Sequence, residues 1–371
     1  MKVTCQRDSL QTACSLVATA VAARTTKPIL SNVKAVAEDD RLTLIAYDTE
    51  VGIRYDLRGI QVGRSGAAIL PITHLTQILR EHSDAEISLD ANDEGTEVRI
   101  GTSRYTMASY PVDEFPDVPS FDDDGRYHEI NSGVLHTMIR RTQFAADKKE
   151  STRFALSGVL WEAEGKQAKL VATDSKRLAV CTGAATLFGP TETTKASHLV
   201  PDKTIKLLMT NLTDEGELVR IALRPNEALF QTERWTIYTR LVEGRYPPYK
   251  DIIPKKSEVK LPLPSALFLS KVRQAAIMTD DETKRVDLTF TVGKLTLQAH
   301  GAETGSSNVE MPIEGFEGND ITIAFDPSYL VEFLRAIDGE PTVMLEITNG
   351  EKPALFRVGE SYLYLVMPLA G

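Results

Sequence analysis

The chain has 371 residues, of which 42% are hydrophobic and 25% are charged, the composition of an ordinary globular protein. This length predicts two or three domains, and the composition excludes a disordered chain, a collagen-like fibre and a small disulfide-stabilised scaffold. The 42 Lys and Arg residues against 52 Asp and Glu residues give a net charge of −10, which taken alone argues against a nucleic-acid-binding protein.

The sequence shows no signal for a membrane or for export. No apolar run approaches the ~18 residues that a membrane-spanning helix needs. The N-terminal stretch MKVTCQRD lacks the apolar core of a signal peptide, so we expect no export. The cysteines, Cys5, Cys14 and Cys181, are odd in number and lack metal-binding spacing. We therefore expect reduced thiols in a cytoplasmic protein.

One unit of the sequence occurs three times along the chain. Residues 30–33 (LSNV) resemble residues 156–159 (LSGV), and residues 44–48 (LIAYD) resemble residues 170–174 (LVATD). Both matches have the same offset of 126 residues, and a fainter third copy spans residues 286–301. Repetition at a fixed offset indicates a repeated structural unit. It predicts three domains, over residues 1–122, 123–254 and 255–371.

Each repeat is expected to contain two helices and several strands in the same order. Apolar residues at helical spacing predict a long opening helix, over residues 8–27, 131–149 and 264–278. A shorter helix begins near a proline, over residues 72–81, 202–212 and 327–337. Alternating residues predict closing hairpins with turns at residues 92–95, 224–227 and 349–350. Because strands outnumber helices, the predicted fold class is α+β, with helices gathered on one face of antiparallel sheets.

The search for catalytic and metal-binding motifs is negative. The sequence has no Walker A motif, no GxGxxG motif after a strand and no HxxxH pair, so we expect neither a cofactor nor a zinc site. Residues 90–95 faintly resemble a calcium-binding loop, but Gly101 stands where the closing Glu would be, which favours a hairpin turn. The acidic residues 122–124 could hold a cation, although a solvated linker is favoured.

Two aspartates, Asp48 and Asp174, recur at equivalent positions of the first two repeats. Two such carboxylates could act as acid and base in a catalytic tandem-repeat enzyme. They belong to different predicted domains, however, and the third copy has Gly301 at that position. We therefore favour a turn or cap role for both residues.

The predicted helices are more basic than the rest of the chain. Together they carry a net charge of +7, which leaves −17 for the strands and loops. Helix propensity alone would favour Glu as well as Lys and Arg, yet Glu is scarce in these segments. If the helices face one way, their surface attracts phosphate groups through electrostatics that do not depend on base sequence.

Four motifs, together with the three repeats, resemble the bacterial DNA sliding clamp family, the beta subunits of DNA polymerase III. The motifs are KPIL at residues 27–30, VATDSKRLAV at 171–180, EGRYP at 243–247 and VMPL at 366–369. The resemblance extends over the whole chain in order. Its most specific parts are the ATDxxRLA stretch and the MP ending.

The resemblance implies a head-to-tail homodimeric ring of six similar domains, with paired helices lining the hole and antiparallel sheets forming the outer wall. Double-stranded DNA passes through the hole without sequence reading. Such a clamp is not an enzyme. It is a processivity factor that holds a polymerase at high effective concentration near the primer end. The implied partners are the DNA polymerase III alpha subunit, an ATP-driven clamp loader, repair polymerases, mismatch-repair proteins and ligase, in a bacterial cytoplasm at the nucleoid.

The resemblance also implies a hydrophobic pocket between the second and third domains that binds short linear peptides of these partners. The matching residues are Leu156, Thr173, Ser175, Leu178, Pro247, Ile252, Leu365, Val366, Met367, Pro368 and Leu369. For Leu178 the alternative is an ordinary core residue. Ser175 stands where relatives often carry Gly, Asp251 where they often carry Arg, and residues 370–371 replace a commonly basic and apolar ending. These differences make the rim of the pocket less positive.

DNA-facing and ring-closing residues are expected as well. Arg24 matches a DNA-facing position of the family, whereas helix charge places Arg140, Arg141, Lys148 and Lys149 at the DNA. Ring closure in the family pairs two edge strands, for which Tyr105 and Met107 match one side and Ile277 and Met278 the other. A scaffold that never meets DNA is the remaining alternative, and the basic helices argue against it.

Overall fold

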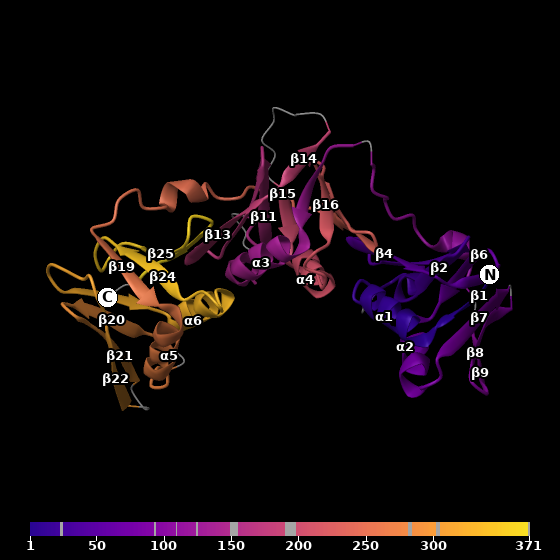
Figure 1. Cartoon of the computed structure of the whole chain (residues 1–371), viewed down its shortest axis with the longest axis horizontal. Helices are drawn as coiled ribbons and strands as arrows, with labels where there is room; N and C mark the ends of the chain where they lie inside the picture. The colour runs from indigo at the N-terminus through magenta and orange to yellow at the C-terminus, as the bar shows by residue number, and fades with distance from the viewer. Residues whose placement is uncertain are drawn as a thin grey trace. The chain divides into compact units, whose positions relative to one another are not determined.

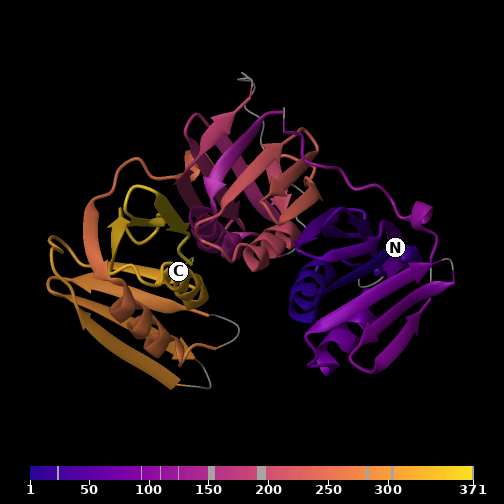
Figure 2. The same ribbon diagram turned by 45° about the vertical axis from the view of Figure 1, so that its right-hand side comes forward.

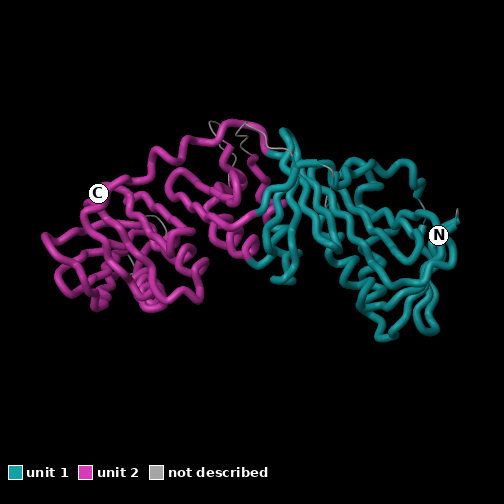
Figure 3. The backbone as a smooth tube through the Cα atoms, turned by 45° about the horizontal axis from the view of Figure 1, so that its top comes forward, with its two compact units in different colours: residues 1–133, 186–194, 206–241 teal, residues 134–185, 195–205, 242–371 magenta. Residues whose placement is uncertain are grey.

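The computed structural model describes residues 1–22, 25–92, 94–108, 110–123, 125–148, 155–189, 198–280, 284–301 and 305–369. Its backbone contacts divide the chain into two compact units (Figure 3). The first unit comprises residues 1–133, 186–194 and 206–241, and the second comprises residues 134–185, 195–205 and 242–371. The predicted middle domain is shared between both units, because its strands join two different sheets.

The first unit contains two antiparallel sheets (Figure 1). One has the order β5-β1-β7-β8-β9, and the other has the order β14-β10-β16-β17-β18-β4-β3-β2-β6. The strands of the smaller sheet are β1 (Lys2–Gln6), β5 (Gln61–Arg64), β7 (Glu86–Asn92), β8 (Gly95–Ile100) and β9 (Ser103–Met107). Those of the larger sheet are β2 (Val33–Glu38), β3 (Arg41–Tyr47), β4 (Val51–Arg58), β6 (Gly66–Leu70), β10 (Tyr127–Asn131), β14 (Thr186–Phe188), β16 (Leu218–Leu223), β17 (Glu227–Gln231) and β18 (Trp235–Arg240).

The second unit is built in the same way. Its larger sheet has the order β15-β11-β12-β13-β26-β25-β24-β19, and its smaller sheet the order β22-β21-β20-β23. The larger sheet comprises β11 (Gly158–Glu164), β12 (Gln167–Thr173), β13 (Arg177–Ala184), β15 (His198–Pro201), β19 (Val259–Pro264), β24 (Thr342–Ile347), β25 (Ala354–Val358) and β26 (Tyr362–Val366). The smaller comprises β20 (Val286–Thr291), β21 (Lys294–Gly301), β22 (Gly305–Pro312) and β23 (Ile321–Phe325). In each unit, one antiparallel pair joins neighbouring repeats, β4 with β18 and β13 with β26.

Each repeat contributes two α-helices to the described structure. They are α1 (Arg7–Ala18), α2 (Ile72–Glu81), α3 (Ser132–Thr142), α4 (Asp202–Asn211), α5 (Ser265–Ala276) and α6 (Pro327–Ala336). Short 3-10 turns are η1 (Pro28–Ser31), η2 (Val112–Glu114), η3 (Gln143–Ala145) and η4 (Tyr249–Ile252). Helix α1 packs against α2, and α5 packs against α6, as Figures 1 and 2 show from two directions. The predicted α+β class, with paired helices on antiparallel sheets, is confirmed.

Two of the long helices end earlier than the sequence predicted. Helix α1 ends at Ala18 instead of residue 27, because residues 19–27 contain several β-branched side chains and Pro28 follows. Helix α3 ends at Thr142 instead of residue 149, and the Thr142 hydroxyl donates back to the Met138 carbonyl at 2.8 Å. The observed helices therefore carry a net charge of +5, and Lys148 follows a helix instead of lying within it.

The hairpins occur where they were predicted, between β7 and β8, β16 and β17, and β24 and β25. The last connection is longer than its Asn-Gly pair suggested, spanning residues 348–353. The Asn349 side chain accepts hydrogen bonds from the backbone N–H groups of Glu351 and Lys352, both at 3.0 Å. It therefore stabilises a wide loop instead of a two-residue turn.

A glycine allows α3 to lie close to the sheet of the second unit. Gly183 in β13 faces the helix, where a Cβ would clash with the Met138 sulfur and lie 2.9 Å from Cγ1 of Val134. Close packing of α3 on β13 therefore depends on the absence of a side chain at this position.

Candidate functional site

The turns at Asp48 and Asp174 have the same construction. In each, the carboxylate accepts hydrogen bonds of 2.8–3.1 Å from the backbone N–H groups two and three residues further along the chain. The next residue, Thr49 or Ser175, has a left-handed backbone conformation, with φ of 82° and 72°. Both aspartates therefore have the turn role that the sequence favoured, and their carboxylates are engaged in local structure.

Arg177 joins the second of these turns to other elements. Its side chain is only 5% exposed and donates from Nε to Asp174 at 2.9 Å. It also donates to the Phe144 carbonyl in η3 at 2.7 Å and pairs with Glu332 of α6. The guanidinium carbon lies 4.5 Å from the ring centroid of Tyr329. The sequence motif included Arg177, but its spacing carried no signal for this connecting role.

The predicted partner-peptide residues all lie in the second unit and differ in exposure. Leu156, Thr173, Leu178, Leu365 and Val366 are buried; Pro247, Pro368 and Leu369 are half-buried; and Ser175, Ile252 and Met367 are exposed. The exposed fractions of Ile252 and Met367 are 48% and 40%, which is high for large apolar side chains. These exposed members are the ones that a bound peptide could cover.

Leu178 belongs to the hydrophobic core. The pairing of β13 with β26 places it opposite Leu365, and both are fully buried. They form a cluster with Val171 and Tyr249, among other residues. Leu178 therefore has a core position in this structure, and its role in a partner pocket stays a prediction.

The chain continues in an ordered form beyond β26. The Met367 N–H donates to the Lys176 carbonyl at 2.8 Å, and the Leu369 N–H donates to the Ala324 carbonyl at 2.9 Å. The first bond attaches the segment to the turn after Asp174, and the second attaches it to β23. Residues 367–369 are thus held beside Ser175 and its turn.

The predicted DNA-facing residues have different surroundings. Arg24 and Lys149 lie outside the described residues. Lys148 is exposed, and Arg140, in the last turn of α3, is half-buried.

Arg141 does not have the exposed position that the sequence predicted. Arg141 is only 8% exposed, and its guanidinium forms an ion pair with the Glu340 carboxylate at 2.6 Å. The guanidinium carbon lies 5.4 Å from the Tyr362 ring centroid, and the Tyr362 hydroxyl donates to the Arg141 carbonyl at 2.6 Å. Arg141 therefore links α3 to the third repeat, and we leave it out of the DNA contacts proposed below.

The predicted ring-closing residues lie on an edge strand, Tyr105 and Met107, and directly after a helix that packs on another edge strand, Ile277 and Met278. Strand β9, which carries Tyr105 and Met107, is an edge strand, and β22, which packs on α5, is another. Tyr105 is 36% exposed, and Met107 is buried. Ile277, directly after α5, is 70% exposed, and Met278 is half-buried. An unpaired edge and an exposed apolar residue are features that a partner surface would cover.

A groove adjoins β9 within the first unit. It has a volume of about 720 Å³ and is lined by Tyr105, Met107 and Ile78, among others. The Tyr105 hydroxyl lies 2.8 Å from His82 Nε2, and the two rings meet edge to face. The position of Tyr105 at the groove is thus set by a residue that the sequence had not singled out.

The described ranges contain no group of three or more His, Cys, Asp or Glu side chains arranged to hold a metal ion. They also contain no helix long and apolar enough to cross a membrane. Cys5, Cys14 and Cys181 are free and buried. Burial raises the pKa of the Cys5 thiol to about 12 and that of the Cys181 thiol to about 11.

Comparison with known proteins gives a consistent result over the whole chain. Family models of the DNA polymerase III beta subunit match its N-terminal domain to residues 1–119, its central domain to 129–248 and its C-terminal domain to 250–370. The beta sliding clamp of Streptomyces coelicolor is 30% identical over 383 aligned positions, which cover 100% of this chain and 99% of the relative.

Solved structures agree with these matches. The sliding clamp of Pseudomonas aeruginosa bound to griselimycin is 28% identical, with a TM-score of 0.93 and 100% of both chains covered. The DNA polymerase sliding clamp of Bacillus subtilis is 26% identical, with a TM-score of 0.93, 100% of this chain and 99% of that chain covered. The repeats, the α+β fold and the motifs therefore have a common explanation. The chain belongs to the DNA polymerase III beta subunit family, the bacterial DNA sliding clamps.

Proposed function

We propose that two copies of this chain close head to tail into a ring that encircles duplex DNA and tethers a DNA polymerase to it. As a sliding clamp, the protein is a non-catalytic processivity factor. The observation that carries the proposal is the match of all three clamp domains, in order, along the chain. A closed ring stays on the duplex by topology, so its contacts with DNA can be weak and salt-sensitive and still permit sliding.

We base ring closure on the edges described above. The exposed Ile277 and the half-buried Met278 would enter the groove beside Tyr105 and Met107 of the second copy. Two sheet edges and an exposed apolar side chain would be covered in the same contact. Because the two sides of the contact differ, the arrangement is head to tail.

The proposed DNA contacts are Arg24, Arg140, Lys148 and Lys149. The exposure of Lys148 and the position of Arg140 at the end of α3 support this assignment. Contacts of this kind reach phosphates and do not read bases, which suits a protein that must slide.

The proposed partner site is formed by Ser175, Ile252 and residues 367–369 over the core around Leu178. Exposed apolar side chains beside a preordered chain end would bind a short extended peptide with one or two large apolar anchors. The individual partners that we propose are the polymerase III alpha subunit, the clamp loader, repair polymerases, mismatch-repair proteins and ligase. We propose that the protein acts in the cytoplasm, at the nucleoid.

The central test is retention on DNA. The clamp is loaded with a bacterial clamp loader and ATP onto nicked circular DNA, and bound clamp is separated by gel filtration at moderate salt. We expect clamp to remain on the circle and to dissociate when the DNA is cut once. Equal retention on circular and linear DNA would contradict the topological mechanism.

A further inference from the structure

Strands β9 and β22 are edge strands that each contact a helix through one of their faces. β9 ends the order of the smaller sheet in the first unit, and β22 begins that of the smaller sheet in the second. The Tyr105 hydroxyl of β9 lies 2.8 Å from His82, at the end of α2, and the Ser307 hydroxyl of β22 donates to the Ala275 carbonyl of α5 at 2.8 Å. Because successive side chains of a strand point to opposite faces, the odd-numbered residues of both strands lie on the helix face.

The unpaired backbone groups of β9 belong to its even-numbered residues. In an antiparallel sheet, alternate residues of a strand bond to each of its two sides. The two-residue turn 101–102 makes its flanking residues a hydrogen-bonded pair, so the odd-numbered residues of β9 bond to β8. A Cβ at Gly95 of β8 would lie 2.6 Å from the Met107 carbonyl oxygen, which agrees with this phase. The N–H and C=O groups of Arg104 and Thr106 therefore point to the free edge.

The backbone of β22 has the same phase. The two-residue turn 292–293 pairs even-numbered residues of β21 with β20, which leaves its odd-numbered residues to bond to β22. Beyond β22, the Ile313 N–H donates to the Gly293 carbonyl at 3.2 Å in the same phase. The free backbone groups of β22 are therefore those of its even-numbered residues, which are Ser306, Asn308 and Glu310.

The exposed faces of the two edges carry opposite charges. Arg104 lies directly opposite Arg99 of β8, and like charges in that position repel each other. Within the chain, Arg104 Nε is 3.4 Å from Glu97, and Glu310 pairs with Lys294 at 2.9 Å. The Arg104 and Glu310 side chains nevertheless stay 64% and 51% exposed. A carboxylate on the free side of Arg104 would therefore offset the repulsion within its own sheet.

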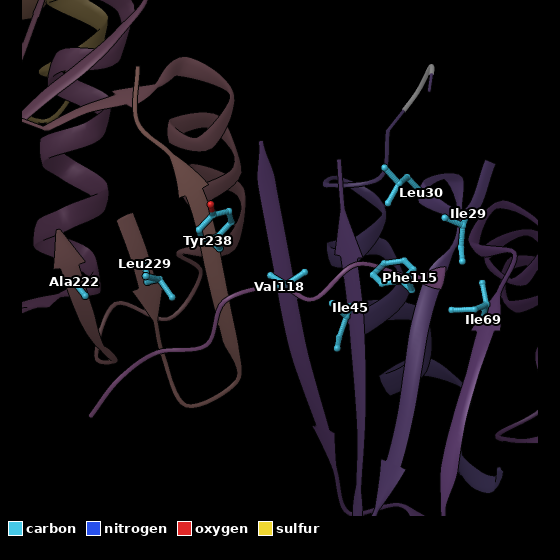
Figure 4. Close-up of a cluster of buried hydrophobic side chains, with 9 residues drawn as sticks. All are labelled: Ile29, Leu30, Ile45, Ile69, Phe115, Val118, Ala222, Leu229 and Tyr238. Atoms are coloured by element: carbon cyan, nitrogen blue, oxygen red, sulfur yellow. The ribbon is translucent and has the colours of Figure 1, made fainter. Parts of the chain in front are cut away.

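The groove beside β9 continues past the C-terminal end of that strand. Its lining runs from Tyr105 and Met107 to Tyr110 and includes residues of the turn η1. This turn is fixed to the core, because its Ile29 and Leu30 side chains are buried in the apolar cluster that Figure 4 shows. The groove is thus a preformed surface at one end of the free edge.

The position of the groove determines the direction in which the two strands can pair. Ile277 follows α5 directly, and the Ala275 carbonyl two residues earlier is bonded to Ser307, in the N-terminal half of β22. If Ile277 enters the groove, that half of β22 must lie beside Met107, near the C-terminal end of β9. The strands then run antiparallel.

We propose that β9 of one copy pairs antiparallel with β22 of the second copy, with Thr106 opposite Asn308 and Arg104 opposite Glu310. The proposal deepens the proposed ring closure and rests on it. The free N–H and C=O groups of these even-numbered residues bond to each other across the contact. Glu310 supplies the carboxylate on the free side of Arg104.

Neighbouring registers fit less well. The proposed register places Val309 opposite Tyr105 on the helix face, an aromatic ring against a β-branched side chain. A shift by one residue would turn the helix face of one strand to the exposed face of the other. A shift by two residues places Arg104 opposite either uncharged Asn308 or Pro312, which has no N–H group to donate.

The test is disulfide cross-linking of the full-length protein. Thr106→Cys is combined with Asn308→Cys, and the covalent dimer that forms on oxidation with copper-phenanthroline is followed on non-reducing gels. Directly opposite residues of a hydrogen-bonded pair have Cα atoms ~5.5 Å apart, within the ~4.4–6.8 Å range of disulfides. The matched controls, T106C/S306C and T106C/E310C, move the second thiol by two residues on the same face, to ~7–8 Å. The natural cysteines are buried.

We expect T106C/N308C to cross-link at least about tenfold faster than either control, because only its thiols lie within disulfide distance. Equal or faster cross-linking of a control would overturn the register. If all three variants sediment as dimers and none cross-links, the edges do not pair, although ring closure stands. A wild-type chain that sediments as a monomer would overturn ring closure and this register together.

A double-mutant cycle tests the charge pair without cysteines. The dimer dissociation constant is measured by sedimentation for Arg104→Gln, Glu310→Gln and the double variant. We expect the two changes to be coupled by about fivefold, because each ring contains the pair twice. Arg104→Gln combined with Glu351→Gln, an exposed carboxylate in the loop between β24 and β25, is the uncoupled control. Independent effects of R104Q and E310Q would contradict their placement opposite each other.

Discussion

Replacing Arg177 by Met should destabilise the second unit far more than the removal of an ordinary surface cation. Arg177 is buried and contacts Asp174, Glu332 and the Phe144 carbonyl. After Arg177→Met, Asp174 keeps its two backbone hydrogen bonds. Glu332, whose side chain is 37% exposed, can be solvated by water. The cost therefore arises mainly at Phe144 and at the ring of Tyr329.

The magnitude follows from these two effects. The Phe144 carbonyl is partly buried, so the loss of its donor costs about 1–2 kcal/mol, less than the ~3 kcal/mol of a fully buried group. Removal of the cation over the Tyr329 ring costs about 0.5–2 kcal/mol. We expect R177M to lower the free energy of unfolding by about 3 kcal/mol. Glu332→Gln, which removes a partly exposed partner, should cost less than about 1 kcal/mol.

The assay uses the two tryptophans as separate reporters. Trp161 is buried in the second unit and Trp235 in the first, so Trp235→Phe leaves fluorescence that reports on the second unit alone. Urea unfolding is measured in that background. The matched control is Arg357→Met, which breaks a partly exposed pair with Glu346 in the same unit. If R177M and R357M unfold at the same urea concentration, the connecting role of Arg177 is wrong.

The other predictions concern DNA, assembly, partners and thiols. Changing Arg24, Arg140, Lys148 and Lys149 to Glu should flatten the plot of log affinity for DNA against log salt by ~0.9 for each phosphate that the side chains no longer neutralise. Lys255→Glu with Lys256→Glu is the control, and an unchanged slope in the quadruple variant would exclude these side chains as DNA-binding groups. Ile277→Asp with Met278→Asp places two charges in the proposed apolar contact between the two copies of the chain. Each unpaired charge should cost the dimer several kcal/mol, so we expect a folded monomer of 40.9 kDa that still binds peptide. If the variant still sediments as a dimer at low micromolar concentration, the contact between the two copies lies elsewhere. Deleting residues 367–371 should cost a few kcal/mol of affinity for a Leu-Phe peptide in calorimetry, at ~25 cal/mol per Å² of apolar surface that is no longer buried, while the dimer persists. Equal affinities would remove this segment from the partner site. Because burial raises the pKa of Cys5 and Cys181, the thiols should not react with Ellman's reagent at pH 8 until the protein is unfolded. Reaction of the thiols with the reagent in the folded protein would contradict this prediction.

Local patterns in the sequence were sufficient for much of the fold. The repeats, the shorter helices α2, α4 and α6, the hairpins and the turns at Asp48 and Asp174 were all predicted, and the structure confirms them. These features depend on residues close together in the chain. The spacing of apolar residues and a proline before a helix act within one helix or strand. An aspartate that accepts hydrogen bonds from N–H groups two and three residues further along acts within one turn.

Local patterns could not predict which charged and apolar side chains of the candidate sites are exposed and which are buried. Arg140 and Arg141 are neighbours in the sequence, yet Arg141 is buried against Glu340, which lies 199 residues further along the chain. Arg177 meets Glu332 across 155 residues, and Val118 fills the space above Gly52. Whether a cation is solvated or paired, and whether an apolar side chain is exposed or buried, depends on which distant strands and linkers pack together. Burial is a property of that packing, because desolvation and pairing energies arise only where the surfaces meet.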